Sequence, residues 1–238
     1  MTIAFISDLH LTPQRPDSSA LFEHFLETTG ALIEELYILG DLFEYWIGDD
    51  AGEQLGHQRI ETALQRATKA GTNIFFIHGN RDFLIGSDFA KRTGCLILPD
   101  PSVITLGDRI VVLSHGDALC TDDVEHQASR NQMLSSKWKG AFLDKSIKER
   151  IDSAEEMRLH SERNKQHKSM EIMDVNQQEV EKMMREHNAE IMIHGHTHRP
   201  GVHEFEVDSK TVKRYVLGDW YEQKSVLTYK KCRSLDQI

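Results

Sequence analysis

The chain has 238 residues, of which 39% are hydrophobic and 28% charged, and its formal net charge is −10 at pH 7. This composition is typical of a soluble globular protein with one sizeable core, and no apolar run approaches the roughly 20 residues of a membrane span. An acidic chain lacks the clustered Lys and Arg that binding along a nucleic-acid backbone requires. We therefore expect a single domain over residues 1–238 that does not bind nucleic acid.

The cysteines and the N-terminus point to a reducing compartment. Cys95, Cys120 and Cys232 are an odd number without C-x-x-C spacing, which argues against both a disulfide framework and a thiolate zinc site. The first residues, MTIAFISDLHL, lack the basic region and cleavage site of a signal peptide and are typical of a first strand. We expect Cys120 to be buried.

Over the first hundred residues, short apolar runs alternate with amphipathic stretches. Strands are predicted at 2–7, 36–40 and 73–79, and helices at 18–29, 54–70 and 87–93. This alternation is typical of βαβ units with parallel strands.

The pattern changes after Pro99. Short strands are predicted in SVITL and RIVVLSHG, with a hairpin turn at Gly107 and Asp108. From about residue 122 to residue 187 there are no strand signals, no proline and one glycine, which predicts a helical insertion. EIMIHG, VHEFEV, VKRYVLG and SVLTY then predict an alternating antiparallel series. The fold class is therefore α/β, with a second, partly antiparallel sheet.

Residues that commonly bind metals lie just beyond five of the predicted strands. They are Asp8, His10, Asp41, Asn80, His115, His196 and His198. Since ligands of α/β sheets bind beyond the carboxyl ends of strands, these side chains should converge on one rim. A single Asp or His at a strand end is usually a turn or capping residue, but five such segments in one chain favour a metal site.

The donor types indicate the metal chemistry. Imidazoles, carboxylates and one amide, without sulfur, suit manganese, iron or zinc better than magnesium alone. Seven ligands exceed one tetrahedral site but suit two ions that share a carboxylate and leave positions open for water and substrate. Such a pair lowers the pKa of a water molecule and neutralises oxygens at phosphorus, so hydrolysis of a phosphate is predicted.

Five motifs carry a family resemblance. They are Asp-Leu-His at 8–10, Gly-Asp at 40–41, Gly-Asn-Arg-Asp at 79–82, Ser-His-Gly-Asp at 114–117 and Gly-His-Thr-His at 195–198. In this order they resemble the motifs of calcineurin-like metallophosphoesterases. The resemblance implies a two-sheet β-sandwich flanked by helices, with Asp41 bridging two metals. It further implies that Asp8, His10 and His198 complete one metal site and that Asn80, His115 and His196 complete the other.

The third motif reads Gly-Asn-Arg where the superfamily usually has Gly-Asn-His. Arginine stays protonated near neutral pH, so Arg81 is a poor proton donor to an alkoxide leaving group, but it can neutralise negative charge. A phosphate leaves without a proton. Arg81 therefore favours cleavage of a diphosphate over hydrolysis of a simple ester.

A narrower resemblance covers nearly the whole chain. LGDLFEYWIGDD at 39–50, HGNRDFL at 78–84, LCTDD at 119–123 and IMDVNQ at 172–177 are similar to segments of the UDP-2,3-diacylglucosamine hydrolases. This family implies water attack at the α-phosphorus of UDP-2,3-diacylglucosamine, giving UMP and 2,3-diacylglucosamine 1-phosphate (lipid X) in lipid A synthesis, with two Mn²⁺ ions. The catalytic residues would be Asp41, Asn80, Arg81, His115 and His196.

Residues 137–168 of the helical insertion carry nine Lys or Arg against six Asp or Glu, a net charge of +3. By resemblance the insertion would cover the active site as a lid. Arg158, Ser161, Lys165 and Lys168 share one helical face, which could bind phosphates or be a solvated charged face. The family places substrate contacts at Asn80, Arg81, Asp123, Ser161, Lys168 and His196, and members can carry Asn at the position of Lys165. Trp138, Phe142, Leu143 and Ile147 could pack on the body or line a groove for two acyl chains.

The basic, partly apolar segment 137–168 also predicts peripheral contact with the cytoplasmic face of the bacterial inner membrane. We expect a monomer. Asp49 and Asp50 are interpreted as turn residues, and His57, His126, His160 and His167 as surface residues. Two alternatives stay open: another metallophosphoesterase acting on a nucleotide or phosphoprotein, which would have to explain Arg81 and the insertion, and a non-catalytic scaffold, which should have lost ligands.

Overall fold

The computed structural model describes residues 2–28, 32–165, 172–221, 224–230 and 235–237. The substrate contact predicted at Lys168 and the surface position predicted for His167 lie outside these residues. The side chains of His160 and Lys165 are likewise outside the description, although both residues belong to a helix.

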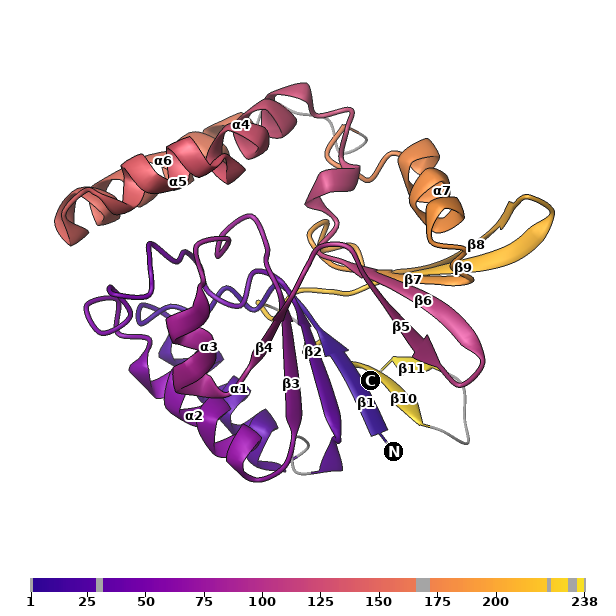
Figure 1. Cartoon of the computed structure of the whole chain (residues 1–238), viewed down its shortest axis with the longest axis horizontal. Helices are drawn as coiled ribbons and strands as arrows, with labels where there is room; N and C mark the ends of the chain where they lie inside the picture. The colour runs from indigo at the N-terminus through magenta and orange to yellow at the C-terminus, as the bar shows by residue number, and fades with distance from the viewer. Residues whose placement is uncertain (1, 29–31, 166–171, 222–223, 231–234, 238) are drawn as a thin grey trace.

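The first sheet has six strands in the order β11-β10-β1-β2-β3-β4 (Figure 1). Its parallel strands are β1 (Thr2–Ile6), β2 (Glu35–Leu39), β3 (Asn73–Ile77) and β4 (Leu96–Leu98), and β10 (Leu227–Lys230) and β11 (Leu235–Gln237) are antiparallel additions. Helices α1 (Pro16–Thr28), α2 (Gln58–Lys69) and α3 (Ser87–Thr93) cover one face. The predicted βαβ units are confirmed.

Alternation along the strands separates two cores. In β1, Ala4 and Ile6 point to the helices and pack with Phe22 of α1, whereas Ile3 and Phe5 point to the second sheet. One face of such a strand packs on helices and the other on a second sheet, so both sets of alternating residues are apolar and the sequence is a continuous apolar run.

The second sheet has the order β5-β6-β7-β9-β8. It contains β5 (Ser102–Leu106), β6 (Arg109–Ser114), β7 (Ile191–His194), β8 (Gly201–Val207) and β9 (Lys210–Val216). The two sheets pack face to face through the core that Phe5, Leu113 and Ile193 share. This is the expected two-sheet sandwich, with helices outside.

The prediction of one alternating antiparallel series after residue 190 was wrong. β8 and β9 form an antiparallel hairpin, but β7 pairs in parallel with both β6 and β9. SVLTY leaves this sheet altogether, because β10 pairs with the free edge of β1. Similarly, the second predicted helix begins at Gln58 rather than residue 54, since turns occupy 50–56 and Gly56 has a left-handed φ of 73°.

The described part of the predicted insertion contains four helices: α4 (Val124–Leu134), α5 (Ser136–Leu143), α6 (Ile147–Lys165) and α7 (Gln177–Glu186). Helix α7 packs on the outer face of the second sheet through Val180 and Met184. Helices α4, α5 and α6 instead extend across the ends of the strands (Figure 1), and we call these three helices the lid. Within the described part of the chain, no helix has the length and apolar character to cross a bilayer.

Candidate two-metal site

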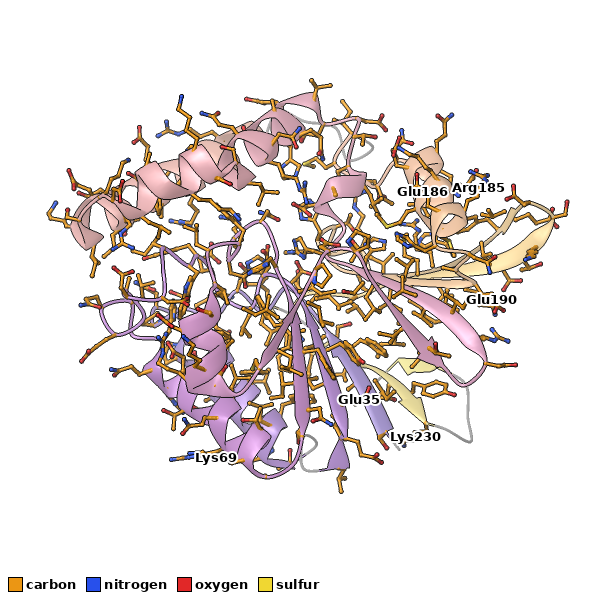
Figure 2. All side chains as sticks on the ribbon, viewed as in Figure 1. Glu35, Lys69, Arg185, Glu186, Glu190 and Lys230 are labelled. Atoms are coloured by element: carbon orange, nitrogen blue, oxygen red, sulfur yellow. The ribbon has the colours of Figure 1, made fainter. Side chains whose placement is uncertain are left out.

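The metal-type residues lie in five loops at one end of the strands, the end covered by the lid. Glu35, Lys69 and Lys230, labelled in Figure 2, mark the opposite end of the body. Because β1, β2 and β3 are parallel neighbours and β6 and β7 are too, their loops leave the sheets side by side. The loops are bonded to one another: the Asp8 amide donates to Gly40 O at 3.1 Å, and the His196 amide donates to Asp8 Oδ2 at 2.9 Å.

Five of these residues have left-handed backbone. Positive φ values occur at Asp8 (56°), His10 (49°), Asp41 (52°), His196 (67°) and His198 (54°). Non-glycine residues rarely adopt this conformation, and such strain concentrates at functional sites. Two neighbouring glycines leave room for the carboxylates. A Cβ on Gly79 would lie 2.1 Å from Asp41 Oδ1, and one on Gly195 would lie 2.3 Å from Asp8 Oδ2.

Two overlapping groups of donor atoms result. Within the described residues, Asp8, His10 and His198 form one group and Asp8, Asp41 and His115 the other, with all donor atoms of each group within 4.8 Å of one another. His198 Nε2 lies 3.3 Å from both Asp8 Oδ1 and His10 Nε2. Asp8 belongs to both groups. Asp41 of the second group also approaches the first, with its Oδ2 3.9 Å from His10 Nε2 and its Oδ1 3.7 Å from His115 Nε2. This is the placement that a bridging ligand requires.

The two remaining predicted ligands adjoin the second group. Asn80 Oδ1 lies 3.1 Å from His115 Nε2. The ring of His196 meets the ring of His115 edge to face, with centroids 5.1 Å apart. The structure thus brings all seven predicted side chains together. Their individual ligand roles stay predictions.

The electrostatics of this cluster fit divalent cations. Asp8 and Asp41 are 0% and 2% exposed, and Asp8 Oδ1 accepts no hydrogen bond from the described residues. Burial raises the pKa of Asp41 to about 6, and the nearby Asp8 adds to this. Although burial opposes it, Asp41 and Asp8 raise the pKa of His115 to about 10. The buried carboxylates thus lie beside an imidazole that keeps its proton. A bound cation would supply the positive charge instead and stabilise the ionised carboxylates.

Other residues orient the imidazoles through their Nδ1 atoms. His198 Nδ1 lies 3.0 Å from Asp219 Oδ2, and His115 Nδ1 lies 2.8 Å from the Leu39 carbonyl. Such contacts fix the ring so that Nε2 faces the site. Asp219 was missed by sequence reasoning, although it follows strand β9 and a glycine just as Asp41 follows strand β2 and Gly40.

Asp82 was also missed as a site residue. Its carboxylate is fully buried and accepts from the amides of Gly79 at 2.9 Å and Leu42 at 2.8 Å. It also accepts from Asp41 N at 3.3 Å. One side chain therefore holds together the loops that carry Asp41 and Asn80.

Two cavities meet at this cluster. One, of about 490 Å³, is bounded by aromatic and aliphatic side chains: Trp46, Phe83, Met133, Trp138, Phe142 and Met157. The other, of about 390 Å³, is bounded by polar ones: His10, Asp41, Asp123, Glu125, His196 and Arg199. We call these the apolar cavity and the polar cavity. They share Asn80, Arg81, His126 and Ser161.

The predicted substrate residues lie around these cavities. Arg158 lines the apolar cavity and Asp123 the polar cavity, while Arg81 and Ser161 line both. Asp123 also caps α4 by accepting from the His126 amide at 3.0 Å. The packing predicted for the apolar lid residues is confirmed for Phe142, and their predicted role in holding acyl chains stays a prediction. Phe142 is buried in the core between the first sheet and its helices, which we call the main core, and it also lines the apolar cavity with Trp138. Leu143 is 42% exposed.

Two of the histidines predicted at the surface are not exposed: His57 is buried and His126 is half-buried. His57 is 4% exposed because its ring stacks on Trp46, with centroids 5.6 Å apart, and packs on Phe43 at 4.4 Å. His126 lines both cavities, and its ring stacks on His196 with centroids 5.4 Å apart. The burial predicted for Cys120 is confirmed at 2% exposure.

Asp49 and Asp50 have structural contacts, but not only within their turn. Asp49 accepts from the amides of Gly86, Asp88 and Phe89, each at 3.0 Å, and so holds the start of α3. Asp50 pairs with Arg150 of the lid.

Known proteins are similar to this chain over nearly its whole length. Residues 1–200 match the family model of the calcineurin-like phosphoesterases. UDP-2,3-diacylglucosamine hydrolase of Aeromonas hydrophila is 47% identical over all of this chain and 97% of its own length. That of Chromohalobacter salexigens is 47% identical over 92% and 89% of the two chains. In fold, the structure of a dimetal phosphatase from Danio rerio matches with a TM-score of 0.52 at 13% identity, over 95% of this chain and 92% of that one. The chain belongs to the calcineurin-like phosphoesterases and, within them, to the family of the UDP-2,3-diacylglucosamine hydrolases.

Proposed function

We propose that this protein hydrolyses the pyrophosphate bond of UDP-2,3-diacylglucosamine to UMP and 2,3-diacylglucosamine 1-phosphate, a step of lipid A synthesis. One observation supports this above others: an apolar cavity under the lid opens onto the metal-type cluster, and Asn80, Arg81, His126 and Ser161 belong to both cavities. An amphiphilic sugar nucleotide needs this combination, because its acyl chains must leave water while its diphosphate meets the charged groups.

The apolar cavity would supply most of the binding free energy. Burial of each methylene group contributes roughly 0.8 kcal/mol, so acyl chains held against Trp138 and Phe83 add far more than the sugar does. Ser161 and Asp123, at the border of the polar cavity, are positioned to hydrogen-bond the sugar. Bound in this way, the diphosphate lies at the cluster, where the two cavities join.

Arg81 is the residue best placed to act on the diphosphate. Its side chain is 17% exposed and lines both cavities. A guanidinium at this point neutralises charge that develops on the departing phosphate, and that leaving group needs no proton. The Arg81 amide has a separate role, because it donates to Asp41 Oδ1 at 2.9 Å and fixes the central carboxylate.

Two divalent ions bound by Asp8, His10, Asp41, Asn80, His115, His196 and His198 would lower the pKa of the attacking water and neutralise the oxygens at phosphorus. We propose Mn²⁺ as the native ion, since imidazole combined with carboxylate and amide oxygen suits it. Metal analysis of protein purified without added metal, followed by reconstitution with single ions, tests this choice. Full activity with zinc or magnesium alone would contradict it.

The protein would act as a monomer at the cytoplasmic face of the inner membrane, where an acylated substrate lies. Exposed apolar side chains occur on the lid: Val124, Leu143, Met157 and Leu159. Together with its many lysines, they give a surface that suits peripheral contact with anionic lipid. Flotation with liposomes tests this contact. Protein that stays wholly in the aqueous fraction, with and without anionic lipid, would contradict it.

The reaction itself is tested by phosphorus NMR of the products formed in oxygen-18 water. Attack at the α-phosphorus places the heavy oxygen in UMP, whereas attack at the β-phosphorus places it in the acylated sugar phosphate. Turnover of p-nitrophenyl phosphate without release of UMP from the acylated sugar nucleotide would reject the proposed substrate.

A further inference from the structure

The lid and the body meet at a charged contact beside the apolar cavity. Arg150 of α6 is 3% exposed, and its Nη1 donates to the Ile47 carbonyl at 2.7 Å and to Asp50 Oδ1 at 2.8 Å. Both acceptors lie in the loop that follows β2 and carries Asp41. The contact therefore links the lid to a loop of the metal-type cluster.

Gly48 makes this close approach possible. Its φ is 125°, in the region that favours glycine. A Cβ at this position would lie 2.5 Å from Arg150 Nη1, 2.7 Å from Asp50 Oδ1 and 2.9 Å from Leu143 Cδ2. A side chain at residue 48 would therefore displace the ends of these three side chains, and L residues rarely adopt this φ.

The first half of α6 packs on the body. Among its described side chains, Arg150 and Ala154 are the buried ones, and Ile147 and Ile151 pack on the main core from a partly buried position. These four residues form one stripe at helical spacing. The other two lid helices have attachments of their own: Arg130 of α4 binds Asp117 at 2.7 Å, and Phe142 of α5 is in the core.

The second half of α6 continues the same stripe over the cavities. Arg158 and Ser161 lie eight and eleven residues after Arg150, so they face the same side of the helix. Eleven residues of helix span about 16 Å, and a tilt of about 10° at the anchor therefore moves Ser161 by about 3 Å. A shift of that size separates a hydrogen-bonding side chain from its partner.

We propose that Asp50 is a positioning residue that sets substrate specificity: it holds Arg150, which aligns α6 so that Arg158 and Ser161 bind the acylated sugar rather than stand away from it. The inference rests on the proposed function and assigns the choice of substrate to a contact outside the metal-type cluster. Small phosphodiesters that do not reach the lid do not depend on this contact.

The test compares two Asp→Asn variants. The Asp50 side chain is 60% exposed. Asp50→Asn therefore removes the negative charge that pairs with Arg150 and leaves no hole in the core. Asp152→Asn is the matched control. Asp152 is on α6, the helix of Arg150, and among the described contacts it pairs only with exposed Lys148. For the acylated sugar nucleotide, Asp50→Asn should raise KM about tenfold with little change in kcat, while Asp152→Asn leaves both at wild-type values. Turnover of bis-p-nitrophenyl phosphate and metal content should stay at wild-type values in both.

Hydrogen exchange gives a readout that does not depend on the substrate. Amides of α6 should exchange faster in Asp50→Asn than in wild type or Asp152→Asn, and Gly48→Ala, which disrupts the same contact sterically, should show the same change. Unchanged exchange and KM in Asp50→Asn would overturn the inference, as would equal effects of the two Asn variants or loss of metal from Asp50→Asn. If wild-type protein releases no UMP from the acylated substrate, the proposed function fails, and exchange alone then decides whether Asp50 positions α6.

Discussion

The rim that carries the metal-type residues and the lid above it are built in opposite ways. At the rim, the carboxylates are buried, the backbone is left-handed at five of the seven positions, and Asp82 ties neighbouring loops through their amides. In the lid, α4 has no buried side chain and α5 buries only Phe142. The metal-type side chains are therefore held by buried loops that bond to one another, whereas the lid helices are held by a few side-chain contacts.

The largest effect should come from the centre of the rim. Asp41→Ala removes the carboxylate that lies 3.9 Å from His10 of one donor group and 3.7 Å from His115 of the other. We therefore expect loss of bound metal and a fall in kcat of about a thousandfold or more. Metal analysis and product release measure both. Asp41→Asn is the control for folding, since Asn tolerates the left-handed backbone of this position. An Asp41→Ala protein with two bound metals would disprove the bridging role.

The rigidity of the rim is tested at Asp82. Asp82→Ala leaves the buried amides of Gly79 and Leu42 without their acceptor, and each such group costs about 1–3 kcal/mol. We expect the free energy of unfolding to fall by about 3 kcal/mol or more in urea titrations. Asp88→Ala, which removes an exposed pair with Lys91, should have almost no effect. Equal stability of the two variants would show that the loops hold together without Asp82.

The buried histidine beside the rim predicts a pH dependence of stability. Burial lowers the pKa of His57 from 6.5 to about 4. Below pH 6.5 the unfolded chain therefore binds a proton that the folded protein does not bind until about pH 4. The free energy of unfolding therefore decreases by about 3 kcal/mol as the pH falls from 7 to 4. Unfolding titrations should show that His57→Phe, which keeps an aromatic ring, loses less over the same range. Parallel curves for the two proteins would contradict a neutral buried His57.

A smaller loss of activity is expected from a change at Arg81, which lines both cavities. Arg81→Ala should lower kcat about a hundredfold, because one charge-stabilising group is removed. Metal content should stay at the wild-type level, since the amide of residue 81 still donates to Asp41 Oδ1. Arg81→Lys should recover part of the rate by restoring the charge. Loss of metal from Arg81→Ala would contradict the separate roles of side chain and amide.

How much the sequence predicts differs between the same two regions. The seven metal-type residues were found because each follows a strand, and parallel neighbouring strands bring their loops together whatever the detailed packing. Asp219 follows a strand in the same way and could have been found. The left-handed φ values, the burial of His57 and the stacking of His126 on His196 could not, since they depend on loops distant in sequence.

The insertion was predicted as helical. The sequence did not predict that α7 packs on the second sheet while α4, α5 and α6 extend across the strand ends. Helix α7 has Val180 and Met184 one turn apart, an apolar stripe typical of a helix that packs on a sheet. The stripe of α6 that faces the body contains Arg150, although arginine is mostly exposed in proteins. Only the tertiary contact with Asp50 shows that this arginine faces inward.

The smallest predicted effect separates binding from chemistry within the lid. Trp138 lines the apolar cavity and stacks on Phe142 with centroids 4.7 Å apart. Trp138→Ala should raise KM for the acylated sugar nucleotide about tenfold, equivalent to about 1.4 kcal/mol of lost apolar contact, and leave kcat near wild type. Turnover of a small phosphodiester should not change, and Lys137→Ala, at the neighbouring exposed position, should affect neither substrate. If Trp138→Ala instead slowed both substrates equally, the lid would be contributing to the arrangement of the rim itself, and the division between a rigid rim and a loosely held lid would not hold.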